Sequence, residues 1–169
     1  MTLPKTQYMQ RRLWGRNMPF YERKAMRIPN YDYATDNYYF ITVCTHEKKC
    51  IFGKPDQLNG FGLIASEYLE KTEALFENIT VDNYIVMPNH IHAIIIIENH
   101  STKRVNLSTI VGQYKAAVTR KIHEQNPDLV VWQRSFHDHI IRNQREYEKI
   151  WEYVQFNSQK WNEDCFYTE

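Results

Sequence analysis

The sequence predicts an α+β domain of the ferredoxin-like type, a split βαβ arrangement whose antiparallel sheet carries helices on one face, with one further helix at the C-terminal end. Segments rich in β-branched and aromatic residues alternate along the 169-residue chain with segments whose apolar residues recur at helical spacing. Their order is strand, helix, strand, strand, helix, strand, helix, and the first six elements match the split βαβ pattern. Two of the strands are separated only by Pro88-Asn89, and so short a connection forces an antiparallel hairpin.

The first half of the chain contains three predicted strands and one helix. Residues 38–46 (YYFITVCTH) have the composition of a strand, and residues 53–60 are expected to form a loop. From residue 61 the apolar side chains predict a helix that ends near residue 77. Residues 81–87 and 90–98 then supply the two strands of the hairpin.

The second half adds a helix, a strand and a last helix. The helix begins near Leu107, with Asn106 or Ser108 as its N-cap, and ends at Asn126-Pro127. Residues 136–142 (FHDHIIR) form a candidate strand, and a helix is predicted from residue 144 to about residue 160. The inner face of this last helix is expected to carry Tyr147, Ile150, Trp151 and Val154. An element added to a common fold is often the place where a specific function is attached.

Length and composition indicate one ordinary globular domain. Hydrophobic residues make up 43% and charged residues 24% of the chain, and the longest aliphatic run, residues 93–97, is only strand-sized. We therefore expect no membrane association, and the absence of an apolar signal segment favours a cytoplasmic protein. The three cysteines include no CxxC pair, which argues against a disulfide framework and a zinc ribbon.

The charge is distributed unevenly. Residues 1–29 contain seven Lys or Arg and one acid, whereas the other 140 residues carry a net charge of −5. We divide the chain into a basic N-terminal arm (residues 1–27) and one domain (residues 28–169). Such an arm indicates a polyanionic partner, although a merely solvated leader has the same composition. Within the arm and the domain, the candidate phosphate contacts, each of which could equally be a solvated surface charge, are Arg11, Arg12, Arg16, Lys115, Arg120, Lys121, Arg134 and Arg142.

Two histidines and a tyrosine carry the candidate chemistry. His90 and His92 stand two residues apart on a predicted strand, so their side chains point to one face about 7 Å apart and can bind one cation. Tyr153 and Asn157 lie one turn apart on the last helix, where the amide oxygen of Asn157 could complete a two-histidine site. Imidazole and amide-oxygen ligands suit Mn²⁺, Mg²⁺ or a related divalent ion. Structural roles, with histidines bonded to carbonyls and a tyrosine that only packs, fit the same residues.

Four segments in this order resemble the REP-associated tyrosine transposases, which are single-tyrosine members of the HUH endonuclease superfamily. These segments are MPNHIHAIIII, STIVGQYKAAVTRKI, VWQRSFHDHIIRN and EYVQFNSQKW, and the resemblance extends over about residues 28–161. It implies that His90, His92 and Asn157 bind a divalent metal, Mg²⁺ or Mn²⁺, and that Tyr153 is the nucleophile. One departure is Ser158, which stands where the family commonly has a proline that would end or kink the helix.

The resemblance implies a metal-dependent endonuclease and strand transferase that acts on single-stranded DNA hairpins. Attack by the tyrosine on phosphorus would give a 5′-phosphotyrosine and a free 3′-OH, from which strands can be rejoined. The implied partners are single-stranded DNA hairpins of the REP type, and the protein would act as a monomer or a homodimer. Two other interpretations stay open: a non-catalytic hairpin-binding protein on the same scaffold, and a different HUH enzyme such as a replication initiator or a relaxase.

Overall fold

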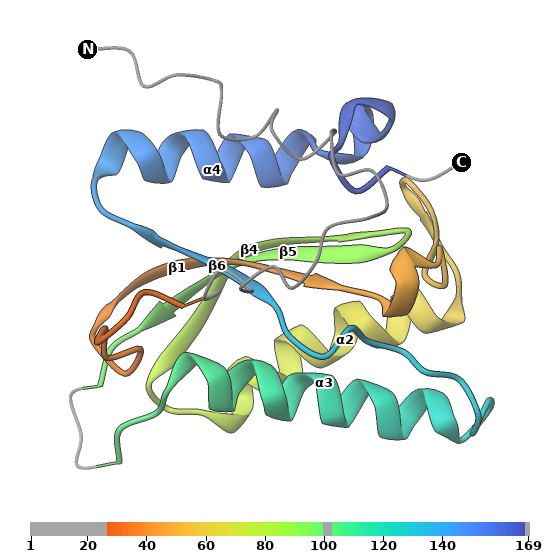
Figure 1. Ribbon diagram of the computed structural model, residues 1–169, viewed down its shortest axis with the longest axis horizontal. Helices are drawn as coiled ribbons and strands as arrows, with labels where there is room; N and C mark the ends of the chain where they lie inside the picture. Colours follow the sequence, from red (N-terminus) through yellow and green to blue (C-terminus); the bar gives the residue numbers. More distant parts are fainter. Residues whose placement is uncertain (1–26, 100–102, 168–169) are drawn as a thin grey trace, which may run out of the picture.

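The computed structural model describes residues 27–99 and 103–167 and confirms the predicted fold class (Figure 1). Its main sheet has four antiparallel strands in the order β4-β5-β1-β6. The strands are β1 (Asn37–Cys44), β4 (Ile79–Met87), β5 (His90–Ile97) and β6 (His137–Ile141). Helices α2 (Gly60–Leu75) and α3 (Leu107–His123) cover one face of this sheet, and α4 (Gln144–Phe156) covers the other (Figure 1).

Strand β5 divides its side chains between these two layers. Ile91, Ala93 and Ile95 belong to the core cluster that includes apolar residues of α2 and α3. Side chains alternate along a strand, so His90 and His92 point to the opposite face, toward α4. The pairing of β5 with β1 sets Thr42 opposite His92 and Cys44 opposite His90. The register of the central strands therefore places both histidines under the C-terminal helix.

Two segments differ in detail from the sequence-based prediction. Residues 53–60 include a short ladder, β2 (Gly53–Lys54) with β3 (Gln57–Leu58), where we expected a loop. The last helix ends at Phe156, and the chain continues as the 3-10 helix η3 (Ser158–Glu163). On α4 only Val154 is buried, while Trp151, which was expected on the inner face, is 37% exposed.

The predicted arm falls almost entirely outside the described residues, and only Arg27 of it is placed. Arg11, Arg12 and Arg16 therefore remain predictions from the sequence. Within the part of the chain that the structure describes, no helix is both long enough and apolar enough to cross a membrane.

Two helical glycines should respond to alanine in opposite ways. A Cβ atom at Gly62 in α2 would overlap the backbone oxygen of Phe52, so Gly62→Ala should overpack this contact and lower the free energy of unfolding by about 1–3 kcal/mol. A Cβ atom at Gly112 in α3 meets nothing within 4 Å, so Gly112→Ala should raise the free energy of unfolding by about 0.5–1 kcal/mol. Urea denaturation of both variants measures the difference. Equal stabilisation by both substitutions would show that the backbone at Phe52 can move away from Gly62 without cost.

Candidate active site

The two histidines of β5 form the centre of the candidate site. Their Nε2 atoms lie 3.0 Å apart, and both residues are buried. The Oδ1 atom of Asn89 lies 2.9 Å from Nδ1 of His90, and Oγ1 of Thr42 lies 2.8 Å from Nδ1 of His92. These two contacts fix each imidazole ring through its Nδ1 atom and direct both Nε2 atoms to one point. Two imidazole nitrogens so close together need a shared proton or a cation between them.

Burial favours the neutral form of both imidazoles. It lowers the pKa of His90 well below the ordinary histidine value, and the neighbouring His92 lowers it further. The pKa of His92 is also lowered, mainly by burial. Neutral imidazole is the form of histidine that binds metal ions.

Tyr153 reaches the same point from α4. Its hydroxyl lies 3.2 Å from Nε2 of His92 and donates a hydrogen bond of 3.2 Å to Oδ2 of Asp164. Its ring packs edge-on against the rings of Phe40 and His92, yet 41% of the residue remains exposed. The phenol oxygen is therefore held at the histidine pair while one side of the ring stays open to solvent.

The other tyrosine of α4 is held elsewhere. Tyr147 donates a hydrogen bond of 2.7 Å to Asp82 of β4, and its ring packs on Tyr38. Burial and this carboxylate raise the pKa of Tyr147 to about 12. The contacts of Tyr147 are those of a packing residue.

Asp164 is a functional candidate that sequence reasoning missed. Its Oδ2 atom lies 3.9 Å from Nε2 of His90 and 4.0 Å from Nε2 of His92, and its side chain is fully buried. Together these three residues offer one ligand atom each within 4.8 Å of one another, close enough that they could hold one metal ion. Burial alone would raise the pKa of Asp164, but the nearby imidazoles of His92 and His90 outweigh it and hold the pKa well below its usual range.

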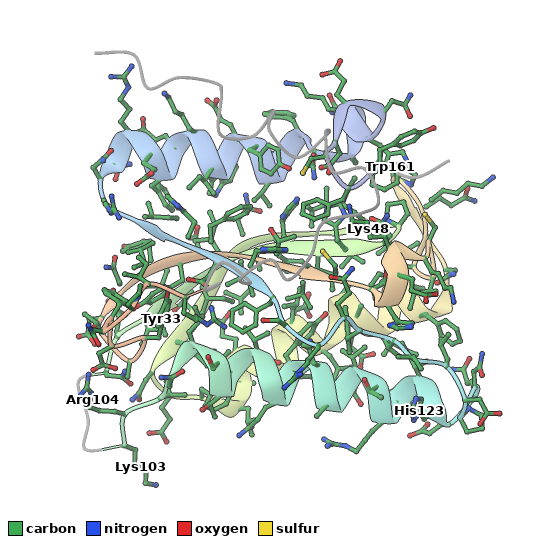
Figure 2. All side chains as sticks on the ribbon, viewed as in Figure 1. Tyr33, Lys48, Lys103, Arg104, His123 and Trp161 are labelled. Carbon is green, nitrogen blue, oxygen red and sulfur yellow. The ribbon has the colours of Figure 1, made fainter. Side chains whose placement is uncertain are left out.

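The segment after α4 brings Asp164 into place and covers the histidines. The ring centroid of Phe166 lies 4.7 Å from that of His90, and Trp161 stacks on His90 at 6.0 Å. The Nδ2 atom of Asn89 donates a 2.8 Å hydrogen bond to the carbonyl of Phe166, which fixes this segment to the start of β5. Nζ of Lys48 lies 5.1 Å from the centre of the Phe166 ring, and Figure 2 labels Trp161 at this end of the α4 layer.

Asn157, the predicted third ligand, lies beside this group. It is only 2% exposed, and among the described residues its Nδ2 atom makes no hydrogen bond of normal geometry. The amide nevertheless helps to lower the pKa of Asp164, so the two side chains are neighbours. A cavity of about 430 Å³ opens next to Tyr153, Asn157 and Asp164, with Lys149 and Lys160 in its lining. This cavity borders Tyr153, Asn157 and Asp164, whereas His90 and His92 do not line it.

The predicted phosphate contacts separate into two groups. Those on α3 lie across the sheet from the histidines, on the side of the labelled His123 (Figure 2). Lys115 donates a 2.5 Å hydrogen bond to the carbonyl of Gln133, and Lys121 pairs with Glu124, while Arg120 is exposed. The structure therefore does not bring Lys115, Arg120 or Lys121 together with Tyr153.

The other two predicted contacts lie near strand ends. Arg134 is exposed in the segment that passes the end of β1, where the N–H of Gln133 donates to the carbonyl of Cys44. Arg142 is exposed directly after β6, on the connection to α4. His139 of β6 pairs with Glu146 at 2.8 Å and does not contact the histidine pair.

Comparison with known proteins shows which family the chain belongs to. The profile of the IS200-like transposases matches residues 33–157, which include both histidines, Tyr153 and Asn157. A Haemophilus influenzae protein of uncharacterised function is 31% identical over 175 residues, a match that covers 90% of this chain and 97% of the relative. A solved structure of a REP-associated tyrosine transposase bound to a REP hairpin superposes with a TM-score of 0.59 at 19% identity, over 85% of this chain and 74% of the other, and supports the fold. The resemblance seen in the sequence is confirmed, and the chain belongs to the family of IS200-like transposases.

Proposed function

We propose that this transposase cuts and rejoins single-stranded DNA at hairpins through a covalent bond between Tyr153 and a 5′-phosphate, with the help of a divalent metal. The observation that carries the proposal is the position of the Tyr153 hydroxyl, 3.2 Å from both Nε2 of His92 and Oδ2 of Asp164. A phenol oxygen held at a cation site can attack a phosphate bound there.

The residues present fit a Mg²⁺ or Mn²⁺ ion. Two neutral imidazoles meet at their Nε2 atoms, an ionised carboxylate lies within 4.0 Å of each, and a buried amide stands next to it. A set of nitrogen and oxygen ligands without thiolate suits these ions. We propose that His90, His92 and Asn157 hold the metal and that Asp164 joins them. A bound divalent ion would supply positive charge that stabilises the negative charge developing on the scissile phosphate.

The chain itself positions the nucleophile. Asp164 accepts the hydrogen bond of the Tyr153 hydroxyl and so orients the phenol oxygen toward phosphorus, and the phenol proton passes to water as the oxygen attacks. The new bond joins the Tyr153 oxygen to phosphorus, the bond from phosphorus to the 3′-oxygen breaks, and that oxygen takes up a proton. Because the phosphodiester is exchanged rather than hydrolysed, attack by a 3′-OH on the phosphotyrosine reverses the step.

The direct test is a search for the covalent product. The full chain is incubated with single-stranded hairpin oligonucleotides and Mn²⁺, and denaturing electrophoresis followed by mass spectrometry locates the modified residue. We expect an adduct at Tyr153 and a free 3′-OH on the released strand. Tight hairpin binding without cleavage or adduct in any divalent metal would instead favour the non-catalytic hairpin-binding protein.

The basic arm should strengthen DNA binding without taking part in the chemistry. Residues 1–26 contain six Lys or Arg and one acid, and each cation that contacts a phosphate steepens the dependence of affinity on salt. Deletion of residues 1–26 leaves Arg27 and its contact with Asp138 in place. The deletion should flatten the plot of log affinity against log salt, while a saturating oligonucleotide is still cut. An unchanged slope in fluorescence anisotropy titrations would show that the arm does not contact phosphates.

A further inference from the structure

Asn89 joins three parts of the chain at the start of β5. It is completely buried, and its Nδ2 atom donates hydrogen bonds of 3.1 Å to the carbonyl of Lys48 and of 2.8 Å to the carbonyl of Phe166. A carbonyl oxygen can only accept, so these two bonds use both N–H groups of the amide and determine which end of it is nitrogen. The other end, Oδ1, therefore has to face Nδ1 of His90, at 2.9 Å.

The orientation of this amide determines where His90 carries its proton. Oδ1 of Asn89 has lone pairs and no hydrogen, so Nδ1 of His90 has to be the donor in their contact. A neutral imidazole has a single N–H group, and burial favours the neutral form. Nε2 of His90 consequently keeps a lone pair, the state in which a histidine nitrogen binds a metal ion.

His92 then needs the opposite arrangement when no metal ion is bound. Its Nε2 atom lies 3.0 Å from Nε2 of His90, a distance at which one of the two nitrogens has to donate a proton to the other. Since Nε2 of His90 has no proton, Nε2 of His92 must be the donor. The Tyr153 hydroxyl donates to Asp164, so its oxygen is also able to accept from this N–H group, at 3.2 Å. Nδ1 of His92 is left to accept from the hydroxyl of Thr42, at 2.8 Å.

Thr42 allows His92 to reverse this arrangement. A hydroxyl group donates and accepts and can rotate, so Oγ1 of Thr42 can pair with Nδ1 of His92 in either tautomer. Burial lowers the pKa of His92, whereas a backbone hydrogen bond with Ile41 acts in the opposite direction, so a carbonyl is also within reach of the ring. The two histidines are thus held by partners of different kinds, an amide that permits one tautomer and a hydroxyl that permits both.

We propose that Asn89 is a positioning residue that fixes His90 as the Nδ1–H tautomer, and that His92 carries its proton on Nε2 in the metal-free chain and on Nδ1 when a divalent ion is bound. In this change one proton leaves Nε2 of His92 and one is taken up at Nδ1, so the net charge of the pair stays the same. The hydroxyl of Thr42 turns from donor to acceptor. The proposal rests on the function proposed above, because it concerns the ligands of the ion used there.

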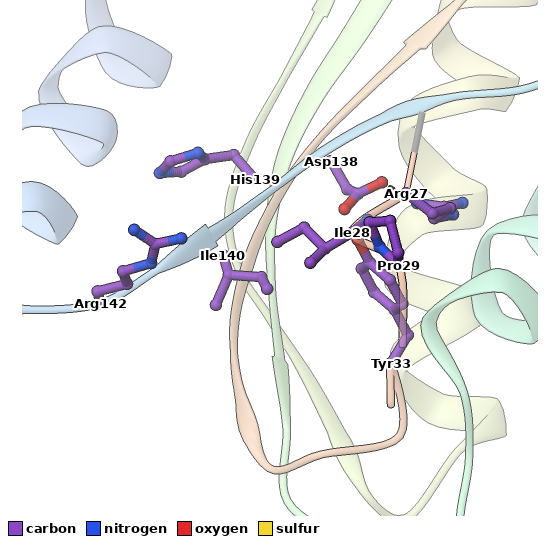
Figure 3. Close-up of a pocket in the computed structure, with 8 residues that line it drawn as sticks. All are labelled: Arg27, Ile28, Pro29, Tyr33, Asp138, His139, Ile140 and Arg142. Atoms are coloured by element: carbon purple, nitrogen blue, oxygen red, sulfur yellow. Dashed lines mark hydrogen bonds and ion pairs between the residues drawn. The ribbon is translucent and has the colours of Figure 1, made fainter. Parts of the chain in front are cut away.

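The test is a two-bond proton–nitrogen NMR spectrum of the full wild-type chain with isotope-labelled histidine, recorded in EDTA. Protonated and unprotonated ring nitrogens have well-separated shifts. Two histidines away from the site serve as references. Nε2 of His123 lies 2.9 Å from the carbonyl of Leu129. His139 lies on β6 among the residues that line a cavity at the edge of the sheet (Figure 3), and its Nε2 atom pairs with Glu146 at 2.8 Å. Both acceptors lack a proton, so both references carry one on Nε2.

In EDTA we expect His90 to be protonated on Nδ1 alone and His92 on Nε2 alone, with the signals assigned by His90→Gln and His92→Gln. Saturating Mg²⁺, which keeps the NMR lines sharp, should move the proton of His92 to Nδ1 and leave His90 unchanged. A proton on Nε2 of His90, or one on Nδ1 of His92 in EDTA, would overturn the proposal. A His92 proton that stays on Nε2 in saturating Mg²⁺ would also overturn it.

Two substitutions at Asn89 separate positioning from structural support. Asn89→Asp and Asn89→Leu both lose the N–H groups that bind Lys48 and Phe166, but only aspartate keeps an oxygen for Nδ1 of His90. Asn89→Leu should weaken Mn²⁺ binding by about 10–100-fold in calorimetry, whereas Asn89→Asp should bind Mn²⁺ at least as tightly as the wild type. Equal losses of Mn²⁺ affinity would mean that Asn89 only supports the fold.

The spectrum in EDTA uses the wild-type chain, so it decides the question even where a variant at Asn89 does not fold. Neither measurement includes DNA. Failure of this proposal therefore leaves adduct formation at Tyr153 intact, whereas absence of the adduct leaves the tautomers of His90 and His92 in EDTA unchanged.

Discussion

Replacing Tyr153 with phenylalanine should abolish both the cleavage of single-stranded DNA hairpins and the covalent protein–DNA adduct. The substitution removes one oxygen, and phenylalanine has no group that can attack phosphorus. The ring keeps its edge-on contacts with Phe40 and His92, and the residue is 41% exposed, so folding and hairpin binding should be retained. Denaturing electrophoresis of the complex, thermal denaturation and anisotropy measure these three properties on one preparation.

Tyr147→Phe provides the matched control on the same helix. It removes the hydrogen bond to Asp82, which should lower the free energy of unfolding by about 0.5–1.5 kcal/mol and leave cleavage unchanged. An adduct that persists in Tyr153→Phe would assign the nucleophile to another residue. Cleavage without an adduct in the wild-type chain would mean that water attacks, and the protein would then be a hydrolytic nuclease.

The fold could be predicted because its elements are marked by local patterns. Apolar spacing located both core helices to within a few residues, and the two-residue connection Pro88-Asn89 predicted the antiparallel hairpin. The 3-10 continuation after Phe156 and the exposure of Trp151 were not predictable in this way. The face that α4 turns to the sheet depends on tertiary packing, so helical periodicity alone does not tell which aromatic residues contact the sheet.

The site was only partly accessible to local reasoning. His90, His92, Tyr153 and Asn157 stand at short spacings within two elements, and the structure brings them together. Asp164 has no fixed spacing to any of them, because η3 reverses the chain between Asn157 and Asp164. The orienting contact of Thr42 with His92 depends on strand register across 50 residues. Contacts of this kind follow from the assembled sheet and leave no signal in the sequence nearby.

Removing either histidine should abolish metal binding and cleavage together. Loss of the ion would remove several kcal/mol of charge stabilisation from the transition state, a rate loss of roughly 10³-fold or more. Because His90 and His92 are buried, alanine at either position also leaves a cavity that lowers stability.

Thr42→Val separates the loss of metal binding from the loss of stability. It keeps the size of the side chain and removes the hydroxyl 2.8 Å from Nδ1 of His92. It should weaken Mn²⁺ binding by about 10–100-fold, as measured by calorimetry.

The loss of Mn²⁺ affinity should be larger when the charged oxygen ligand is replaced than when the neutral one is. Asp164→Asn keeps the shape of the side chain but removes the negative charge within 4.0 Å of both histidines, so Mn²⁺ affinity should fall substantially. Asn157→Ala should have a milder effect, because a water molecule can replace one neutral oxygen ligand. A larger loss for Asn157→Ala than for Asp164→Asn would make Asn157 the principal oxygen ligand and leave Asp164 as the hydrogen-bond acceptor of Tyr153. Full Mn²⁺ affinity in both histidine variants would show that the pair is structural, and the attack by Tyr153 would then have to proceed without a metal at this site.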